Sequence, residues 1–256
     1  LFGSFLLKSG AGDFIVRLDA HSTPDPNYVT RCITALETGQ GENVGGVWQI
    51  APGGDGWLAR SIAAAAAHPL GVGDARYRFT EQAQLVDTVP FGAFRRTLVD
   101  RIGTFDETLL TNEDYEFNVR VRQSGGRVWL DPAIQSTYFA RGTLGALARQ
   151  YLRYGYWKAQ MLRRYPETIR WRQATPPLSV LNLIVLALLA VWFPWVCWLL
   201  ALEAFLYALA LLAAGVQVGL KNRDFLLSLG VPLAIAIMHI SWGSALLWSL
   251  IVKHNE

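Results

Sequence analysis

Hydrophobic and polar positions follow two different patterns along the chain, and the change falls near Pro176 and Pro177. Before this point, short apolar runs alternate with polar and charged segments, which is typical of a soluble domain built from strands and helices. After it, the side chains are too apolar for a surface in contact with water. The charged residues of this second part are Glu203, Lys221, Arg223, Asp224, Lys253 and Glu256. The pattern therefore predicts an α/β domain followed by transmembrane α-helices.

Apolar residues fill the range 179–220, a run about twice as long as the roughly twenty residues that cross ~30 Å of hydrocarbon. We interpret it as two helices joined by a tight turn near residues 192–195, where Pro194 lies among aromatic side chains suited to a membrane interface. The range 225–252 is long enough for a third helix. It is either a third crossing or, because Pro232 and Gly243 interrupt it, a re-entrant or interfacial segment.

Basic side chains gather immediately before the apolar half of the chain. The range 141–172 contains eight of them and one acid, Glu167. By the positive-inside rule this side faces the cytoplasm, and Lys221 and Arg223 return to the same side two crossings later. Tyrosine and tryptophan residues lie between the basic ones, so we expect membrane lipids or a phosphate as partners, and no nucleic acid.

Residues 14–18 have the β-branched and apolar content of a buried strand. Asp19 and His21 follow where this strand ends, and ligands bind at the carboxyl ends of strands in open α/β sheets. Carboxylate oxygen and imidazole nitrogen are both acceptable ligands for magnesium or manganese. Taken alone, however, an Asp-x-His pair more often belongs to a turn that ends a strand.

Two further strands or strand edges are predicted at residues 44–48 and 85–92. Gly92 either permits close approach of the backbone to a sugar or belongs to an ordinary turn. An alanine-rich helix is predicted over residues 57–67, and it ends before Pro69 because proline cannot continue it.

A second helix is predicted to begin at Glu113, capped by Thr111 or Asn112. This start places Glu113 and Asp114 at the mouth of the helix, where a carboxylate can take the proton of a sugar hydroxyl. The alternative is that the acids only complement the helix macrodipole. Spacing does not decide which of the two carboxylates is the base.

The range 143–162 carries apolar residues on one helical face, as a helix lying in the membrane surface does. Gln150 and Arg153 lie off this face and are candidates for holding an acceptor sugar or a departing diphosphate, since arginine binds phosphate through two donors. The alternative is that the arginines of this range only reach toward lipid headgroups.

Four short motifs occur in order along the chain. They are Arg17-Leu18-Asp19-Ala20-His21, Gly103-Thr104-Phe105-Asp106-Glu107, Asn112-Glu113-Asp114-Tyr115-Glu116 and Gln150-Tyr151-Leu152-Arg153-Tyr154. With this ordered set the chain resembles the family 2 glycosyltransferases, and in particular the succinoglycan-biosynthesis glucosyltransferase branch of bacterial exopolysaccharide assembly. The resemblance covers residues 13–177 and implies a GT-A-type, Rossmann-like catalytic domain.

The resemblance also implies a role for each motif. Asp19 and His21 would bind the diphosphate of a nucleotide-sugar donor through a divalent metal, Mg²⁺ or Mn²⁺, although His21 stands where an aspartate is usual. Asp114 would be the catalytic base, and the family's Gln-x-x-Arg-Trp motif would be represented with a tyrosine in its last position. The expected substrate-binding residues are Glu113, Gly92, Arg149, Gln150, Arg153 and Tyr154.

Family members begin with a βαβ half that grips uracil and ribose, and the 18 residues before Asp19 are too few for that unit. We therefore expect this chain to be the C-terminal part of such an enzyme. Its predicted regions are a partial catalytic domain at 1–140, a basic interfacial helix region at 141–177 and a membrane domain at 178–256 with two to three transmembrane helices.

The implied reaction is inverting transfer of a hexose, with glucose the expected sugar, from a UDP-sugar to a lipid-linked saccharide in bacterial exopolysaccharide biosynthesis. The expected location is the bacterial inner membrane, as a multi-pass protein with its catalytic part in the cytoplasm. One alternative is transfer of the sugar to polyprenyl phosphate. Another is a membrane-anchored assembly subunit without catalytic activity.

Overall fold

The structure is a computed structural model and describes residues 4–9, 12–19 and 22–252. The chain divides into two compact units, each made from two segments. The first unit is Leu1–Ala51 with Ala75–Phe139, and the second is Pro52–Asp74 with Ala140–Glu256. Pro52–Asp74 thus belongs with the C-terminal helices, although it lies inside the range 1–140 in sequence.

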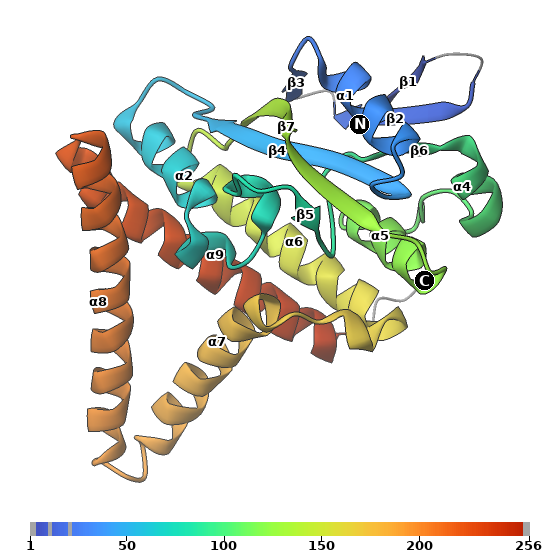
Figure 1. Ribbon diagram of the computed structural model, residues 1–256. Coiled ribbons are helices and arrows are strands. Elements are labelled where there is room, and N and C mark those ends of the chain that lie inside the picture. The colour runs from blue at the N-terminus through green and yellow to red at the C-terminus, as the bar shows by residue number, and fades with distance from the viewer. Residues whose placement is uncertain (1–3, 10–11, 20–21, 253–256) are drawn as a thin grey trace. The chain divides into compact units, whose positions relative to one another are not determined.

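The first unit is built on a mixed sheet whose strands run in the order β1-β2-β6-β4-β7-β3, with β5 paired to β7 (Figure 1). Its strands are β1 Ser4–Ser9, β2 Phe14–Asp19, β3 Ser22–Pro24, β4 Asn43–Ala51, β5 Gln84–Leu85, β6 Ala93–Arg95 and β7 Val128–Phe139. The pairing of β4 with β7 is parallel, and the other pairings are antiparallel. A mixed α/β sheet with helices is what the sequence pattern predicts.

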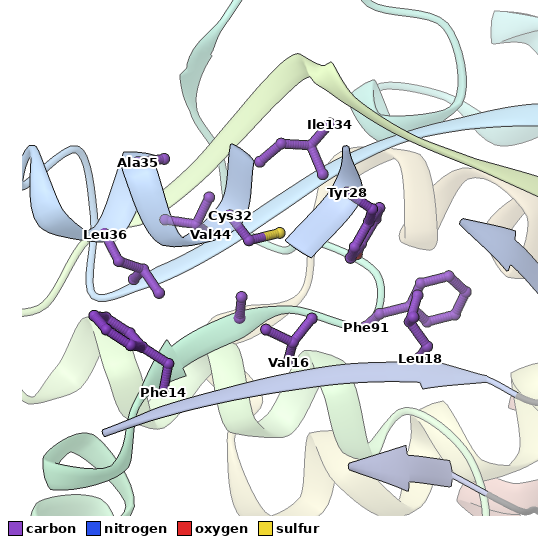
Figure 2. Close-up of a cluster of buried hydrophobic side chains, with 11 residues drawn as sticks. Phe14, Val16, Leu18, Tyr28, Cys32, Ala35, Leu36, Val44, Phe91 and Ile134 are labelled. Carbon is purple, nitrogen blue, oxygen red and sulfur yellow. The ribbon is translucent and has the colours of Figure 1, made fainter. Parts of the chain in front are cut away.

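Successive side chains of β2 pack on opposite faces of this sheet. Phe14, Val16 and Leu18 pack in one apolar cluster with helix α1 (Tyr28–Glu37), as Figure 2 shows. Ile15 packs on the opposite face, in a cluster that includes side chains from α4 (Arg96–Ile102) and α5 (Glu113–Gln123). Because successive side chains of a strand point to opposite faces, the odd-numbered residues of β2 belong to the α5 side.

The strands predicted at 14–18 and 44–48 are confirmed as β2 and β4. The strand predicted over 85–92 is wrong for most of its length, because β5 ends at Leu85 and β6 begins at Ala93. Phe91 and Gly92 lie between them with φ of 64° and 82°, in the left-handed region that no strand adopts. The segment therefore turns before β6.

Helix α5 begins at Glu113, and Asn112 takes its N-cap position, both as predicted. The backbone of Asn112 is in the left-handed region with φ 68°, however, and its side chain makes no capping hydrogen bond. The first turn instead contains Glu113, Asp114 and Glu116, whose charges favour a helix N-terminus. The helix gives way at Ser124 to Gly125, whose φ of 81° suits glycine.

The second unit consists of helices. They are α2 Trp57–Ala67, α3 Pro69–Val72, α6 Leu144–Arg164, α7 Trp171–Leu189, α8 Val196–Asn222 and α9 Phe225–Ile251. Short 3₁₀ turns at Arg76–Arg78 and Pro166–Thr168 lie in the first and second units, respectively. The predicted helix at 57–67 is confirmed, and so is the predicted turn between two apolar helices at 192–195.

Helices α7, α8 and α9 are each long and apolar enough to cross a membrane. They differ in how much of each helix is covered by protein. Only 11% of the most apolar window of α7 and of α8 is buried, whereas 39% of that of α9 is buried. Three apolar helices of membrane length are therefore present, as expected, and α9 has a different environment from the other two.

Candidate active site

One buried guanidinium gathers the three acids that the sequence singles out. Arg17 on β2 is 5% exposed, and its Nη2 donates to Oε1 of Glu113 at 2.8 Å. Its Nη1 forms an ion pair with Asp114, and its Nη2 lies 3.7 Å from Oδ1 of Asp19. Asp19 and the Glu113–Asp114 pair are far apart in sequence, and the fold of the first unit brings them to one point.

The alternation of β2 explains why this is possible. Arg17 and Asp19 lie two residues apart and so share the face on which Ile15 packs with the α5 cluster. The backbone N–H of Arg17 donates to the carbonyl of Gly92 at 3.0 Å, which ties β2 to the turn before β6. The guanidinium carbon of Arg17 lies 4.7 Å from the centre of the Phe105 ring, a cation–π contact that holds the head group in place.

Asp114 is supported from behind by a buried amide. Asn118, one helical turn later, is 1% exposed and donates from Nδ2 to the carbonyl of Asp114 at 2.7 Å and to Oγ1 of Thr88 at 3.1 Å. Its Oδ1 accepts from Nδ2 of Asn43 at 2.7 Å. Buried polar networks of this kind rigidify the groups they hold, so the start of α5 is fixed to strand β4.

A second buried ion pair fixes the loop that carries Phe105. Glu116 is 2% exposed and accepts two hydrogen bonds from Arg120, at 2.7 and 2.8 Å. Arg120 also donates to the carbonyls of Ile102 at 2.5 Å and Thr104 at 2.7 Å. The loop before α5 is thereby attached to α5 itself, which positions the Phe105 ring beside the guanidinium of Arg17.

The cluster has more negative than positive groups, because three carboxylates face one guanidinium. The side chain of Arg17 is 6% exposed, whereas those of Asp19, Glu113 and Asp114 are 25%, 30% and 28% exposed. The cation is thus inside and the carboxylates reach the solvent. A phosphate group would be repelled here unless a cation lay between it and the carboxylates.

This donor set fits a divalent metal of a particular kind. Among the residues that the structure describes, no group of three or more His, Cys, Asp or Glu side chains is placed to hold an ion. Mg²⁺ is typically bound by one or two carboxylates together with substrate phosphates and water, so Asp19 satisfies the protein's share. His21, the other predicted ligand, lies outside the described residues.

Gly92 has a structural explanation that does not involve a sugar. Its φ of 82° lies where side chains are strained, and a Cβ at this position would lie 2.5 Å from Oδ1 of Asn43. Asn43 is the residue that bonds Asn118, so the glycine lets the turn pack against the network behind Asp114. A direct contact of Gly92 with substrate remains a prediction.

The remaining predicted residues lie on α6 of the second unit. Gln150 donates from Nε2 to the hydroxyl of Tyr154 at 2.8 Å, so these two residues act as a pair. The ring of Tyr154 lies 5.9 Å from that of Tyr151. Arg149 is exposed and Arg153 is partly buried. Their predicted roles in holding acceptor or diphosphate remain predictions.

Sequence reasoning did not identify Arg17, Asn118 and Arg120 as members of the site. A signal was present for Arg17, because a charged residue inside an otherwise apolar strand must be paired when it is buried. Asn118 and Arg120 give no comparable signal, since polar residues on a helix are usually solvated. Their partners lie on other strands and loops.

A family model described as "Glycosyl transferase family group 2" matches residues 14–252, which include every element of the site. The chain belongs to this glycosyltransferase family. The resemblance inferred from the four motifs is therefore confirmed, and the protein is a glycosyltransferase.

Two relatives are similar to this family 2 glycosyltransferase over most of its length. The succinoglycan biosynthesis protein ExoA of Rhizobium meliloti (strain 1021) is 29% identical over 237 residues, which cover 92% of this chain and 69% of that protein. The dolichyl N-acetyl-alpha-D-glucosaminyl phosphate 3-beta-D-2,3-diacetamido-2,3-dideoxy-beta-D-glucuronosyltransferase of Methanococcus voltae is 24% identical over 246 residues, covering 93% of this chain and 71% of that protein. The predicted similarity to a succinoglycan-biosynthesis protein is thus also confirmed.

Proposed function

We propose that this glycosyltransferase moves a hexose from a UDP-sugar to a lipid-linked saccharide, with inversion at the transferred carbon, in bacterial exopolysaccharide biosynthesis. The observation that carries the proposal is the convergence of Asp19, Glu113 and Asp114 on Arg17. The cluster combines a carboxylate suited to a metal with a carboxylate suited to proton transfer. A GT-A-type arrangement, in which the donor binds beside the end of β2, is consistent with the sheet.

Asp114 is the proposed general base. Its carboxylate is part exposed, and both its backbone and its side chain are held, by Asn118 and Arg17 respectively. A base must lie within hydrogen-bonding reach of the proton that it takes, and the contacts with Asn118 and Arg17 hold the Asp114 carboxylate in one position. Glu113 is the proposed partner of the acceptor hydroxyl, since it is equally held by Arg17 and reaches the solvent.

Asp19 is the proposed protein ligand of a divalent metal, together with His21 two residues later in sequence. The metal, when bound, neutralises the negative charge that develops on the departing diphosphate. Arg17 compensates part of the charge of the three carboxylates before donor and metal arrive. Arg149 and Arg153 on α6 are the proposed further contacts to phosphate, and Gln150 with Tyr154 the proposed contacts to the acceptor sugar.

The nature of the acceptor rests on two observations. The relative from Methanococcus voltae is named for a reaction on a dolichyl-phosphate-linked sugar, which is a lipid-linked saccharide. The second unit of this chain carries apolar helices of membrane length, and basic residues precede them. We therefore propose that the enzyme is a multi-pass protein of the bacterial inner membrane, with its catalytic unit on the cytoplasmic side.

Transfer directly to polyprenyl phosphate is the second candidate function. The basic side chains of α6 favour it, because they would bind a lipid phosphate as readily as a diphosphate. The two reactions differ in their product. Direct transfer yields a lipid that releases a monosaccharide in mild acid, whereas the proposed reaction yields a lipid that releases a longer saccharide.

The proposal can be tested by transfer of label from UDP-[¹⁴C]glucose into the lipid extract of membranes that contain the protein. Asp114→Asn should abolish transfer, and Asp100→Asn is the matched control because Asp100 is an exposed acid on α4 of the same unit. Label that requires Mg²⁺ or Mn²⁺, survives in the control and is lost in Asp114→Asn supports the proposal. Equal label in both variants excludes Asp114 as the base, and label confined to a monosaccharide lipid favours the second candidate.

A further inference from the structure

Helices α7 and α8 form a hairpin with little protein around it. Nδ2 of Asn182 on α7 donates to Oε2 of Glu203 on α8 at 2.7 Å, and a short turn joins the two helices. The 19 residues of α7 extend about 28 Å at 1.5 Å per residue, close to the ~30 Å of a hydrocarbon core. If α7 and α8 cross the membrane in succession, the beginning of α7 and the end of α8 lie on the same side.

Helix α9 begins at the end of α8. Asp224 caps it by accepting from the N–H of Leu226 at 3.0 Å, and Arg60 of α2 donates to the same carboxylate at 3.0 Å. Gly219 of α8 packs directly on Ser228 of α9, with no room for a Cβ. The first turns of α9 are thus fixed to the end of α8, on the side where Lys221 and Arg223 lie.

The C-terminal half of α9 contacts the beginning of α7. Trp242 donates from its indole N–H to the carbonyl of Gln173 at 3.3 Å. A Cβ on Gly243 would lie 2.7 Å from the carbonyl oxygen of Pro176, so the backbones of α9 and α7 approach closely here. Gln173 and Pro176 belong to the first turns of α7.

The C-terminal end of α9 is bound to α6. Arg163 donates to the carbonyls of Ser249 at 2.5 Å and Val252 at 3.2 Å, and Gln160 donates to the hydroxyl of Ser249 at 2.9 Å. Helix α6 ends at Arg164, and six residues separate it from α7. Ile251 follows Gly243 by eight residues, or about 12 Å of helix, so the last turn of α9 also lies near the beginning of α7.

These contacts conflict with a third crossing. A crossing α9 would extend about 40 Å and place its two ends on opposite sides of the bilayer. Its C-terminal half would then draw α6 into the hydrocarbon. The basic residues of α6 are Arg149, Arg153, Lys158, Arg163 and Arg164. Each costs roughly 2.5–3.5 kcal/mol at the centre of a membrane helix, and no acid on α6 offsets them.

The two faces of α9 also differ in how far protein buries them. One face is buried by its neighbours and includes Val231, Ile235 and Met238. The other carries exposed apolar side chains from the first turn of the helix to the last. Its members are Phe225, Leu229, Leu233, Ile240, Trp248 and Ile251. Protein thus covers one face of α9, and the exposed apolar face is available to lipid.

We propose that α9 lies in the plane of the membrane surface, with this exposed stripe in the lipid, and that the chain crosses the membrane twice. Both ends of α9 then lie on the side of α6 and Lys221. The inference rests on the proposed crossings by α7 and α8 and is independent of the transferase reaction. Of the two readings of residues 225–252 that the sequence leaves open, the contacts of α9 favour the interfacial one.

The sidedness test uses single cysteines at Lys221, Trp192 and Val252 in the full-length protein with Cys197→Ser. Cys32 can remain because it is fully buried. A membrane-impermeant maleimide is applied to spheroplasts and to inverted membrane vesicles. We expect K221C and V252C to remain unlabelled in spheroplasts and to be labelled in inverted vesicles. W192C should be labelled in spheroplasts and remain unlabelled in inverted vesicles. V252C labelling together with W192C would overturn the proposal, and so would W192C labelling together with K221C, because α7 and α8 would then not cross.

Depth in the bilayer provides an independent measurement on the same stripe. Nitroxide labels on L229C, I240C and I251C should show equal shallow depths, about 5–10 Å below the headgroups. A label on L206C, exposed in the middle of α8, is the deep control. A spanning α9 would instead place Ile240 about 15 Å deep, at the bilayer centre, with the other two labels shallow. That result would overturn the proposal even if the cysteine variants of the first test failed to fold.

Discussion

Removing the guanidinium of Arg17 isolates its contribution to both stability and activity. Arg17→Met keeps a long apolar side chain against Phe105 but leaves Asp19, Glu113 and Asp114 without their shared cation. Breaking a buried ion pair by removing one partner costs roughly 3–5 kcal/mol. Because the carboxylates are about a quarter exposed and partly screened, we expect a loss near the lower limit, about 3 kcal/mol of unfolding free energy.

The matched control is Arg95→Met. Arg95 is an exposed arginine on the nearby strand β6, and it stacks on the Phe14 ring at 4.6 Å. Such an exposed cation–π contact contributes about 0.5–1 kcal/mol, so the control should lose no more than that. Urea unfolding of the detergent-solubilised protein, followed by tryptophan fluorescence, would measure both variants.

A double variant separates charge compensation from packing. Asp114→Asn in the Arg17→Met background removes one of the uncompensated charges, so the double variant should be more stable than Arg17→Met alone. Transfer activity should fall by about 10²-fold or more in Arg17→Met, because the base is no longer held in place. If Arg17→Met lost no more stability than Arg95→Met, the idea that Arg17 holds the carboxylate cluster would be refuted.

Other parts of the molecule can be tested in the same preparation. Gly155→Ala on α6 should lower the free energy of unfolding by about 1–3 kcal/mol, since its Cβ would overlap the backbone of α9. In the control Gly145→Ala on the same helix, the new Cβ meets nothing closer than 3.7 Å, so the free energy of unfolding should rise by up to about 1 kcal/mol. Equal thermal shifts in the two variants would contradict this packing. Cys32 should resist iodoacetamide at pH 8 until the protein is unfolded, because burial raises the pKa of its thiol to about 12, and mass spectrometry of the native protein would reveal any adduct. Burial alone would raise the pKa of Asp74, but its hydrogen bond with Arg172 contributes to a net lowering of that pKa. Asp74→Asn should therefore lower the free energy of unfolding by about 1 kcal/mol at pH 7. This difference between the variant and the wild type should disappear only below pH 3.8, and a constant difference down to pH 2 would contradict the ion pair.

Local patterns in the chain were sufficient for most of the secondary structure. The helix at Trp57–Ala67, strand β2 and the three apolar helices follow from composition and period, because burial in a sheet or a bilayer imposes its pattern on neighbouring residues. The turn before β6 was misread as strand, since its apolar content hides the left-handed backbone of Phe91 and Gly92. Asn112 takes the predicted cap position of α5, but its left-handed conformation leaves its side chain without a capping bond.

The sequence alone determined the family, the order of the motifs and the acids expected to carry the chemistry, because these depend on residue types at short spacing. The tertiary structure decided which cation those acids share, since Arg17 meets Glu113 and Asp114 only when α5 packs on the face of the sheet to which the Arg17 side chain points. It also decided the surroundings of α9, whose composition allows a crossing but whose contacts with α6, α7 and α8 support a place in the membrane surface. Length and hydropathy report how well a helix tolerates lipid, and only its neighbours determine where in the bilayer it lies.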